Sequence, residues 1–458
     1  MTVSISRKIA YEILRRVESE GAYASDLLHA DLTPNTKPED AALATEIVMG
    51  VLRWRRQLDV LIEKYTKKPI ARFDLAVAIA LRMGVYQLRF LDRVPARAAV
   101  NESVEIVKRA RKASAATLVN AVLRRAAEEA RKPAEQLLGP ISSSAERLAI
   151  LHSHPTWMVE RWMARLGESR TLGLLEANNR TPRLSCAIHD ISERDAVMNE
   201  LQAAGLLVSP GEMLKSAFAV SGGSPARTEA FRAGKISIQD EASQTVPLLV
   251  EVQAGDRVLD LCAAPGGKTS ALVRGAGADG LVVASERHAH RLRAMRDQFK
   301  RLGLNQVRLV EVDAEKTLPF GIQFDRILVD APCSGTGTLA RHPEIRWRLR
   351  PEQLAEFHRL QCALLENAIE TLKPGGRLVY STCSMEPEEN EEVVRGVLKK
   401  RGDVRLIGRE VGPNSLRDEL TDNVDVQAFF DHEGYFRTSP SAHGADGFFA
   451  AVIGRSES

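Results

Sequence analysis

From about residue 236 onward, the sequence alternates between short runs rich in Val, Leu and Ile and longer segments of helical character. This alternation is typical of a parallel sheet whose two faces are covered by helices. In such sheets, ligands bind beyond the carboxyl ends of the strands. We therefore predict a mostly parallel α/β domain over residues 236–456 and look for chemistry where each strand ends. The predicted strands are residues 257–263, 280–286, 307–313, 324–332 and 376–383.

The first predicted strand runs into a loop of small residues that opens a helix. Small residues let the backbone amides of a helix N-terminus approach a ligand closely. The loop matches neither the GxGxxG pattern of dinucleotide folds nor the GxxxxGK[ST] pattern of a P-loop. A tight strand-to-helix turn would explain two glycines but not the whole run, so we interpret the loop as a binding site. Its residues are Cys262, Ala263, Ala264, Pro265, Gly266, Gly267 and Lys268.

Acidic residues close the second and third predicted strands. Glu286 can accept hydrogen bonds from both hydroxyls of a ribose, as the acid of dinucleotide folds does. Asp313 is placed to accept a hydrogen bond from the exocyclic amine of an adenine ring. Taken alone, each acid is more often a solvated strand end or a helix cap. Together, at the ends of successive strands, they predict an adenosine pocket.

Two of the five cysteines fall just beyond the fourth and fifth predicted strands. Cys333 follows Asp330 in DAPCSGTG, and Cys383 lies in YSTCS. An isolated cysteine is usually a buried small hydrophobe, but core filling does not require loops rich in Pro, Ser and Gly. An odd number of scattered cysteines forms neither a disulfide framework nor a paired CxxC metal pattern. We therefore predict two free thiols at the ligand crevice and no metal site.

The first 130 or so residues are predicted to form a compact bundle of about six helices. Apolar residues recur there at four-residue spacing, and proline-containing segments divide the helices. The spaced residues are Ile9, Ile13 and Val17, then Leu43, Ile47 and Val51, then Leu75, Ile79 and Met83, then Leu118 and Val122. The breaks are Thr33-Pro34-Asn35, Lys68-Pro69 and Val94-Pro95.

The positive charge of the chain is concentrated in this front segment. Residues 1–140 carry 24 Lys and Arg against 17 Asp and Glu, whereas the remaining residues carry 39 against 43. A basic front end suggests contact with a polyanion. A well-solvated helical surface explains the same charge equally well.

Between these two regions, the sequence predicts a linker and a small mixed domain. Residues 131–144 have the composition of a linker, and residues 152–167 form an aromatic amphipathic helix. His152 and His154 are interpreted as capping or surface residues rather than metal ligands, because no matching Cys/His pair follows. Residues 180–235 combine strand-like runs at 184–188 and 218–220 with a helix at 195–205. The predicted domains are therefore 1–138, 139–235 and 236–456.

Three segments, DLCAAPGGK, DAPCSGTG and YSTCS in this order, resemble the RNA cytosine-C5 methyltransferase family. QDEAS (239–243), RHPEIRW (341–347) and DGFFAAVI (446–453) also match, so the resemblance covers roughly residues 150–455. The two-cysteine arrangement separates this family from DNA cytosine methyltransferases, which use the fourth-strand cysteine as the nucleophile. In one departure, Glu286 stands where many relatives have Asp.

The front segment resembles the antitermination-factor (NusB) family of RNA-binding bundles, in RMGVYQLRFLDRVPARAAVNESVEIVKR (82–109) and LVNAVLRR (118–125). The whole chain is similar to bacterial 16S ribosomal RNA methyltransferases of the cytosine-967 type. The resemblance implies a multidomain fold: an all-α NusB-like bundle, a small α+β subdomain of RRM or ferredoxin-like type, and an α/β class I (Rossmann-like) methyltransferase domain.

The resemblance also implies roles for the residues at the strand ends. Cys383 would attack carbon 6 of the cytosine, because carbon 5 is not nucleophilic enough to take a methyl group unaided. Cys333 would assist release, Asp330 would hydrogen-bond the base at N3, and Lys268 would belong to the catalytic group. S-adenosylmethionine, with S-adenosylhomocysteine as its product, would be held by Cys262, Ala263, Ala264, Pro265, Gly266, Gly267, Lys268, Glu286, Asp313 and Asp330.

The implied substrate is an unpaired cytosine in 16S ribosomal RNA, unassembled or in an early subunit precursor, since the base must leave its stack to reach the thiols. Front-domain cations would contact phosphates: Arg53, Arg55, Arg56, Lys108, Arg109, Arg111 and Lys112. We expect a cytoplasmic monomer without a membrane segment, because no signal-like or membrane-length apolar run is present. The alternatives are a transfer-RNA cytosine-C5 methyltransferase, a non-catalytic RNA-binding assembly factor and a small-molecule methyltransferase.

Overall fold

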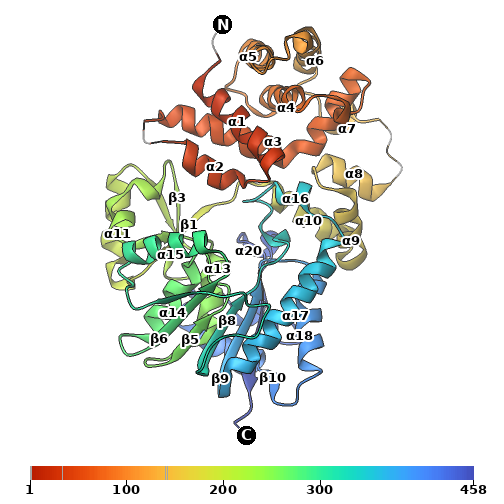
Figure 1. Cartoon of the computed structure of the whole chain (residues 1–458). Coiled ribbons are helices and arrows are strands. Elements are labelled where there is room, and N and C mark those ends of the chain that lie inside the picture. The colour runs from red at the N-terminus through yellow and green to blue at the C-terminus, as the bar shows by residue number, and fades with distance from the viewer. Residues whose placement is uncertain (1–2, 34, 140, 142, 458) are drawn as a thin grey trace. The chain divides into compact units, whose positions relative to one another are not determined.

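The computed structural model describes residues 3–33, 35–139, 141 and 143–457, with the backbone alone for 411–415. The chain divides into two compact units (Figure 1). The helical unit comprises Met1–Thr181 and Leu339–Leu349, and the sheet unit comprises Pro182–Thr338 and Arg350–Ser458. Within the described residues, no helix is both long enough and apolar enough to span a bilayer.

The helical unit begins with the predicted bundle of six α-helices. These are α1 (Ile5–Glu20), α2 (Ala24–Asp31), α3 (Pro38–Thr66), α4 (Leu75–Phe90), α5 (Ala96–Arg109) and α6 (Ala116–Glu128). It continues through α7 (Ala134–Leu137), α8 (Ser144–Leu151), α9 (Thr156–Leu166) and α10 (Glu168–Asn179). The segment predicted as a linker therefore contains one short helix and the start of another, and α8 and α10 flank the predicted aromatic helix.

Local signals fix where these helices begin. Pro38 occupies the first turn of α3, where its missing N–H is not needed. The side chain of Asp74 caps α4 by accepting a hydrogen bond from the Ala76 amide at 3.0 Å. The predicted breaks at Lys68-Pro69 and Val94-Pro95 lie between helices, and Pro34 lies outside the described residues. The spaced apolar side chains form one core, including the fully buried Ile13, Ile47 and Met83. The exception is Leu75, which begins α4 and is exposed.

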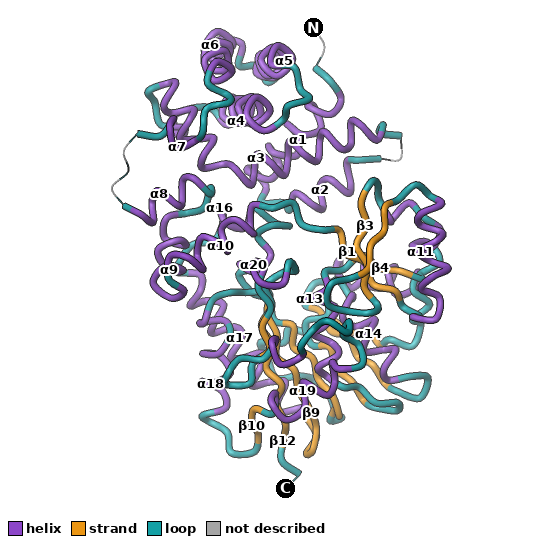
Figure 2. The backbone as a smooth tube through the Cα atoms, turned by 180° about the vertical axis from the view of Figure 1, so that it is seen from behind, coloured by secondary structure: helices purple, strands orange, loops and turns teal. Residues whose placement is uncertain are grey.

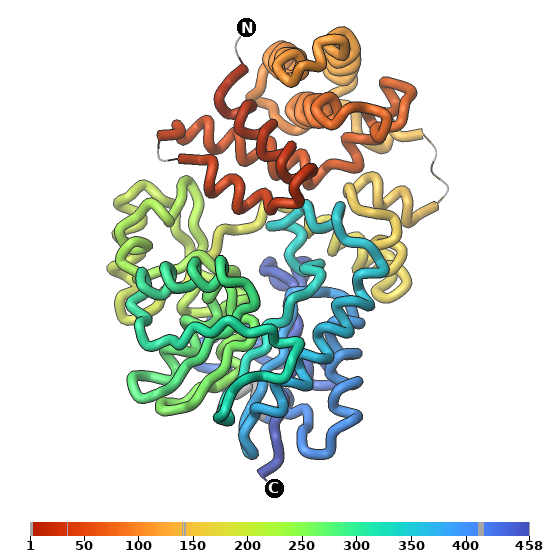
Figure 3. The backbone as a smooth tube through the Cα atoms, in the orientation of Figure 1, coloured from red at the N-terminus to blue at the C-terminus, as the bar shows by residue number. Residues whose placement is uncertain are grey.

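One segment of the helical unit comes from far along the sequence. Residues 339–349, which include α16 (Ile345–Arg348), pack among the helices (Figure 3, cyan beside the red helices). Arg346 is fully buried and donates to the main-chain oxygens of Ser153 and Asn178, at 3.0 and 3.1 Å. Trp347 Nε1 donates to the Leu52 oxygen at 2.6 Å. The sequence motif RHPEIRW is therefore an anchor in the helical unit.

The sheet unit contains two sheets, drawn in orange in Figure 2. The smaller is antiparallel, in the order β2-β3-β1-β4, and carries α11 (Arg194–Ala203) and α12 (Glu229–Arg232). Its strands are β1 (Leu184–Ile188), β2 (Leu207–Pro210), β3 (Ala217–Ser221) and β4 (Ile236–Ile238). Because β4 pairs with β1, this small sheet extends past residue 235.

The larger sheet follows the order β10-β12-β9-β8-β5-β6-β7, with β11 paired to β12. The five predicted strands are all parallel neighbours, which confirms the mostly parallel α/β fold. They are β5 (Arg257–Asp260), β6 (Leu281–Glu286), β7 (Arg308–Glu311), β8 (Phe324–Asp330) and β9 (Leu372–Thr382). An antiparallel edge is added by β10 (Val404–Leu406), β11 (Phe436–Arg437) and β12 (Phe449–Arg455).

Alternate side chains of the central strands enter different cores, as the two-residue period of a strand requires. Ile327 and Val329 pack in the core that contains α17 and α18, whereas Leu328 packs in the core that contains α14 and α19. The helices of the larger sheet are α13 (Glu241–Thr245), α14 (Gly267–Ala276), α15 (Ala289–Arg301), α17 (Gln353–Thr371), α18 (Glu391–Leu398), α19 (Gly408–Arg417) and α20 (Pro440–His443).

Candidate active site

The two predicted cysteines meet at the carboxyl end of the larger sheet. β8 and β9 are parallel neighbours in which Asp330 is paired with Ser381. Each strand then runs into a loop, and Cys333 Sγ lies 3.4 Å from Cys383 Sγ. This separation is far longer than a disulfide bond of about 2.05 Å, so both sulfurs are free thiols within hydrogen-bonding range. Both side chains are partly exposed to solvent.

Lys268 and Asp330 form an ion pair beside these loops. Lys268, in the first turn of α14, places its Nζ 2.6 Å from Asp330 Oδ2. Ser381 Oγ donates to the other carboxylate oxygen at 2.8 Å, so Asp330 is held on both sides. Burial lowers the pKa of Lys268, but the charge and hydrogen bond of Asp330 outweigh burial and raise it overall. Lys268 is therefore a fixed cation at the strand ends.

The loop of small residues opens onto a cavity of 150 Å³. Gly266 precedes α14 at φ +101°, and a Cβ there would lie 2.9 Å from the Phe299 ring, so this turn requires glycine. Asp260 also lines the cavity, and its buried Oδ1 has no hydrogen-bond partner among the described residues. The predicted residues along the cavity wall are Cys262, Ala263, Ala264, Pro265, Gly267, Lys268 and Asp330.

Burial of the strand ends perturbs several acid groups. Burial, reinforced by the charge of Asp330, raises the pKa of Asp260 to about 7, although a hydrogen bond from Thr269 opposes the shift. The hydrogen bond with Cys383 and burial raise the pKa of the Cys333 thiol well above its usual range. Burial also raises the pKa of Cys262. Cys333 is therefore held as a protonated thiol beside Cys383.

Glu286 and Asp313 lie at the ends of neighbouring strands, but both carboxylates already have partners within the protein. The Glu286 carboxylate accepts a hydrogen bond from the His288 amide at 2.9 Å. Asp313 pairs with Lys316 at 3.0 Å, which lowers the pKa of its carboxyl. The described lining of the 150 Å³ cavity includes neither acid and neither Cys333 nor Cys383. The pairing of β6 with β7 does bring the two acidic ends together.

Comparison with known proteins identifies the family. A model described as 16S rRNA methyltransferase RsmB/F matches residues 247–454; a NusB family model matches 4–128, and a ferredoxin-like domain model of RsmF/B-like methyltransferases matches 154–227. The probable ribosomal RNA small subunit methyltransferase B of Bacillus subtilis (strain 168) is 32% identical over 448 residues, 97% of each chain. The chain belongs to the 16S rRNA methyltransferase RsmB/F family.

Solved structures agree with this assignment. The crystal structure of PH0851 matches with a TM-score of 0.82 and 26% identity, covering 99% of each chain. A methyltransferase homologue from Pyrococcus horikoshii matches with a TM-score of 0.57 and 31% identity, covering 69% of this chain and 100% of that one. The RsmB/F fold, with its NusB-like, ferredoxin-like and methyltransferase parts, is therefore established for this protein.

In the NusB-like part, the structure corrects the predicted cluster of phosphate-binding cations. Arg53 is 5% exposed and donates to the Ala340 oxygen, so it is not available to RNA. Arg55 pairs with Glu18 at 3.0 Å, and Arg56 donates to the His154 oxygen at 2.9 Å. Arg53 and Arg55 lie on nearly opposite sides of α3, and this helix packs against α1, α4, α6 and α8, so charge counting could not reveal that all three side chains bond within the unit. Lys108, Arg109 and Arg111 are exposed, and the partly exposed Lys112 pairs with Asp74.

The structure also corrects the interpretation of His154 as a capping or surface residue. His154 is fully buried, its Nδ1 lies 2.7 Å from the His152 oxygen, and its ring lies edge-on to Trp162. Burial lowers its pKa well below the usual range. His154 is therefore a neutral core side chain. Within the described residues, no cluster of three or more potential metal ligands is found.

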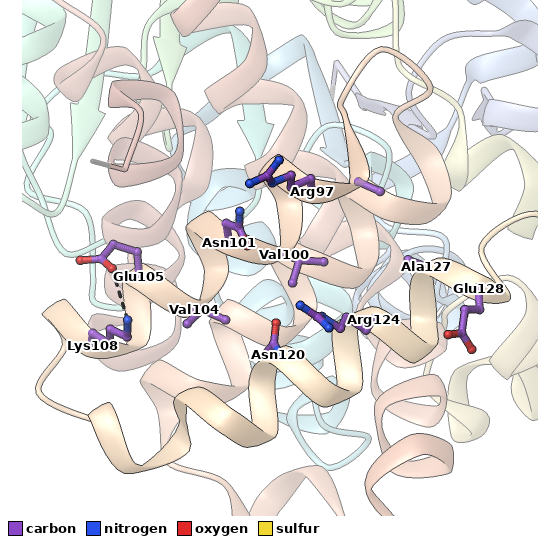
Figure 4. A pocket seen from close by; sticks show the side chains of 11 residues that line it. Arg97, Val100, Asn101, Val104, Glu105, Lys108, Asn120, Arg124, Ala127 and Glu128 are labelled. Carbon is purple, nitrogen blue, oxygen red and sulfur yellow. Dashed lines mark ion pairs between the residues drawn. The ribbon is translucent and has the colours of Figure 1, made fainter. Parts of the chain in front are cut away.

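A groove of 780 Å³ lies between α5 and α6, and every lining residue comes from these two helices. Figure 4 shows Arg97 and Asn101 on α5 and Asn120 and Arg124 on α6. Arg97, Arg124 and Lys108 are exposed to solvent. Lys108 lies 3.8 Å from Glu105 in an ion pair at the rim. The groove thus combines cations with amide side chains, a combination suited to phosphate and base contacts.

Sequence reasoning missed the buried residues that hold the cysteine loops. Glu389, Gln361 and Asn390 are buried and hydrogen-bonded to the loops that carry Cys333 and Cys383. The available signals were the serine that follows each cysteine and the polar run Glu388-Glu389-Asn390 beyond the second cysteine. Neither signal predicts a contact without the fold.

Proposed function

We propose that this protein transfers a methyl group from S-adenosylmethionine to carbon 5 of a cytosine in 16S ribosomal RNA, through a covalent bond between Cys383 and carbon 6. The observation that carries the proposal is the 3.4 Å approach of two thiols at neighbouring strand ends, in the same sheet unit as the Lys268–Asp330 pair. The RNA substrate is supported by the similarity to the probable ribosomal RNA small subunit methyltransferase B of Bacillus subtilis. Cytosine 967 is the target that the sequence resemblance suggests.

The residues around the 150 Å³ cavity fit S-adenosylmethionine. Small side chains at the start of α14 leave room for a ligand, and Asp260, whose Oδ1 has no hydrogen-bond partner among the described residues, is one of the residues that line the cavity. Lys268 and Asp330 reach the same cavity. When bound, this cofactor supplies an electrophilic methyl group on a sulfonium sulfur. In our proposal Glu286 and Asp313 hold its adenosine part from the neighbouring strand ends.

The protein's own residues then prepare the base. The thiolate of Cys383 adds to carbon 6, and the electron pair of the C5=C6 bond makes carbon 5 nucleophilic. A proton taken up from water bridges the Asp330 carboxyl group and N3, which makes this addition easier, and Lys268 and Ser381 fix the carboxyl group. The Cys333 thiol lies 3.4 Å from Cys383 Sγ, so in our proposal it donates a hydrogen bond to the Cys383 thiolate as the covalent bond breaks.

Ribosomal RNA contacts are assigned to the α5–α6 groove and the adjacent cations. Arg97, Lys108 and Arg124 provide charge, and Asn101 and Asn120 provide amides. Phosphate contacts of this kind give affinity that falls with salt. Arg109 and Arg111 extend the charged surface at the end of α5.

The test uses methyl-labelled cofactor, transcribed 16S RNA and two variants. We expect Cys383→Ala to abolish methyl transfer and to form no adduct. We expect Cys333→Ala to accumulate a denaturant-resistant protein–RNA adduct. The reverse result would exchange the two roles, and labelling of transfer RNA in preference to 16S RNA would overturn the substrate.

A further inference from the structure

Each cysteine of the site is followed by a serine, and both serines bond to one buried carboxylate. Ser334 Oγ and Ser384 Oγ both donate to Glu389 Oε1, the latter at 2.5 Å. The Ser334 amide donates to Glu389 Oε2 at 2.8 Å. Glu389 is 0% exposed. One side chain therefore ties the two thiol-bearing loops together.

The Cys333 loop is held on both sides by the same group of residues. Gln361 Nε2, on α17, donates to Glu389 Oε2 at 3.1 Å and to the Pro332 oxygen at 2.9 Å. Pro332 and Ser334 are the two neighbours of Cys333 in the chain. The main chain on either side of Cys333 is thus fixed by Gln361 and Glu389.

The Cys383 loop has additional supports. Asn390 Nδ2 donates to the Ser384 oxygen at 2.9 Å, and the Gly337 amide donates to the Cys383 oxygen at 2.9 Å. Ser384 gives Glu389 one hydrogen bond, whereas Ser334 gives it two. Loss of Glu389 would therefore loosen Cys333 more than Cys383.

A buried carboxylate is costly unless its oxygens are well satisfied. Burial raises the pKa of Glu389, and the hydrogen bonds from Ser334, Ser384 and Gln361 oppose this shift. The four donors occupy both carboxylate oxygens, and each belongs to a cysteine loop or to the side chain that holds one. A side chain needed only for packing would be apolar, so we interpret the carboxylate as the group that fixes the geometry of the two cysteine loops.

We propose that Glu389 is the positioning residue for product release: it holds Cys333 where its thiol can stabilise Cys383 as the covalent bond breaks. This inference rests on the proposed function. After methyl transfer, carbon 5 carries a methyl group and a proton. The C5–H bond breaks, its proton passes to water, and its electron pair re-forms the C5=C6 bond. The C6–S bond breaks, and its pair leaves on Cys383 as a thiolate that accepts a hydrogen bond from Cys333.

The test is Glu389→Gln, measured by the fraction of enzyme trapped on RNA in a denaturing gel. An amide has a single acceptor oxygen and an N–H₂ group, so it cannot accept from all four donors. We expect the trapped fraction to rise several-fold over wild type. Turnover should fall by about tenfold to 100-fold, because a misplaced Cys333 slows product release. The rate of the first methyl transfer, which precedes release, should change by less than about threefold.

The matched control is Glu392→Gln, which removes the same charge from an exposed position three residues further on. This control should behave as wild type. A purely structural role for Glu389 would reduce first transfer and trapping together, with no accumulation of adduct. Folded Glu389→Gln that traps no more RNA than wild type would overturn the proposal.

A milder pair of variants covers the case in which Glu389→Gln does not fold. Ser334→Ala removes the hydrogen bond from the Ser334 hydroxyl to Glu389. Ser384→Ala removes the corresponding bond from Ser384, together with the one that Ser384 Oγ accepts from the Glu386 amide. Ser334→Ala should trap more adduct than Ser384→Ala, and equal or reversed trapping would contradict the proposal. If wild type methylates RNA and Cys333→Ala traps it while neither Glu389→Gln nor Ser334→Ala does, the positioning role alone fails. If Cys333→Ala traps nothing, the proposed function itself fails.

Discussion

The strand ends of the sheet unit and the cations of the helical unit differ in how well position in the sequence indicates position in the fold. Residues far apart in the sequence, such as Lys268, Asp330 and Cys383, lie in one group of strand ends because parallel strands deliver their carboxyl ends to one edge. By contrast, Arg53 and Arg55 are close in sequence to Arg56 and share its charge, yet all three bond within the helical unit. The strand order brings the candidate catalytic residues together, whereas the packing around each helix decides which charged side chains are exposed to solvent.

The largest expected effect concerns the nucleophile. Cys383→Ala should lower methyl transfer by at least about 1,000-fold, because no other described thiol is placed to replace it at the end of β9. The measurement is single-turnover transfer of labelled methyl groups. Cys362→Ala, which alters a partly buried thiol on α17, is the control and should retain activity. Residual transfer within tenfold of wild type would place the nucleophile elsewhere.

The second prediction tests whether Lys268 and Asp330 act as one unit. Lys268→Met should reduce transfer by about 100-fold, since it leaves the Asp330 carboxylate without its cation. Asp330→Asn should cause a similar loss. The double variant should be little worse than either single variant, because groups that act together are not additive. If the fold-loss in transfer rate of the double variant equals the product of the losses in the two single variants, the two residues act separately.

The third prediction concerns pH. The pKa of Asp260 is raised from 3.8 to about 7 by burial, so the folded protein binds a proton that the unfolded chain releases between these values. Stability should therefore fall as pH rises from 4 to 7, by about 3 kcal/mol from this group. Asp260→Asn should remove that part of the slope in urea unfolding, and Asp297→Asn, at an exposed site, should not. Equal slopes for wild type and Asp260→Asn would contradict the assignment.

The smallest expected effect is on RNA binding, and it compares exposed with buried cations. Joint replacement of Arg97, Lys108 and Arg124 by Ala should weaken RNA binding by about tenfold and lower the salt slope by about 2. Arg55→Met should leave the salt slope unchanged and cost about 1–2 kcal/mol of stability, because Glu18 loses a partner. Binding titrations at several salt concentrations separate the two results. A lower slope for Arg55→Met would reverse the comparison.

Much of the fold follows from the sequence because local patterns carry it. The apolar runs of β5 to β9 and the four-residue spacing in α1 to α6 predict the elements in place. The loop before α14 is predictable because Gly266 occupies a backbone conformation that other residues rarely adopt. The order of the strands then brings Cys333 and Cys383 together.

The parts that could not be predicted depend on packing between distant segments. Arg346 is anchored in the helical unit although the neighbouring sequence belongs to the sheet unit. From the sequence, His154 is interpreted as a capping or surface residue, yet it lies in the core against Trp162. Glu389 resembles any acid of a solvated run until the fold places it between Ser334 and Ser384.

The most direct test of the central claim is to identify the residue that carries the RNA in the trapped complex. Cys333→Ala is incubated with cofactor and 16S RNA, the adduct is digested with protease and nuclease, and the modified peptide is sequenced by mass spectrometry. We expect a methylated cytosine nucleotide on the peptide that contains Cys383. A nucleotide on any other residue, or an adduct that forms equally well in Cys383→Ala, would contradict it.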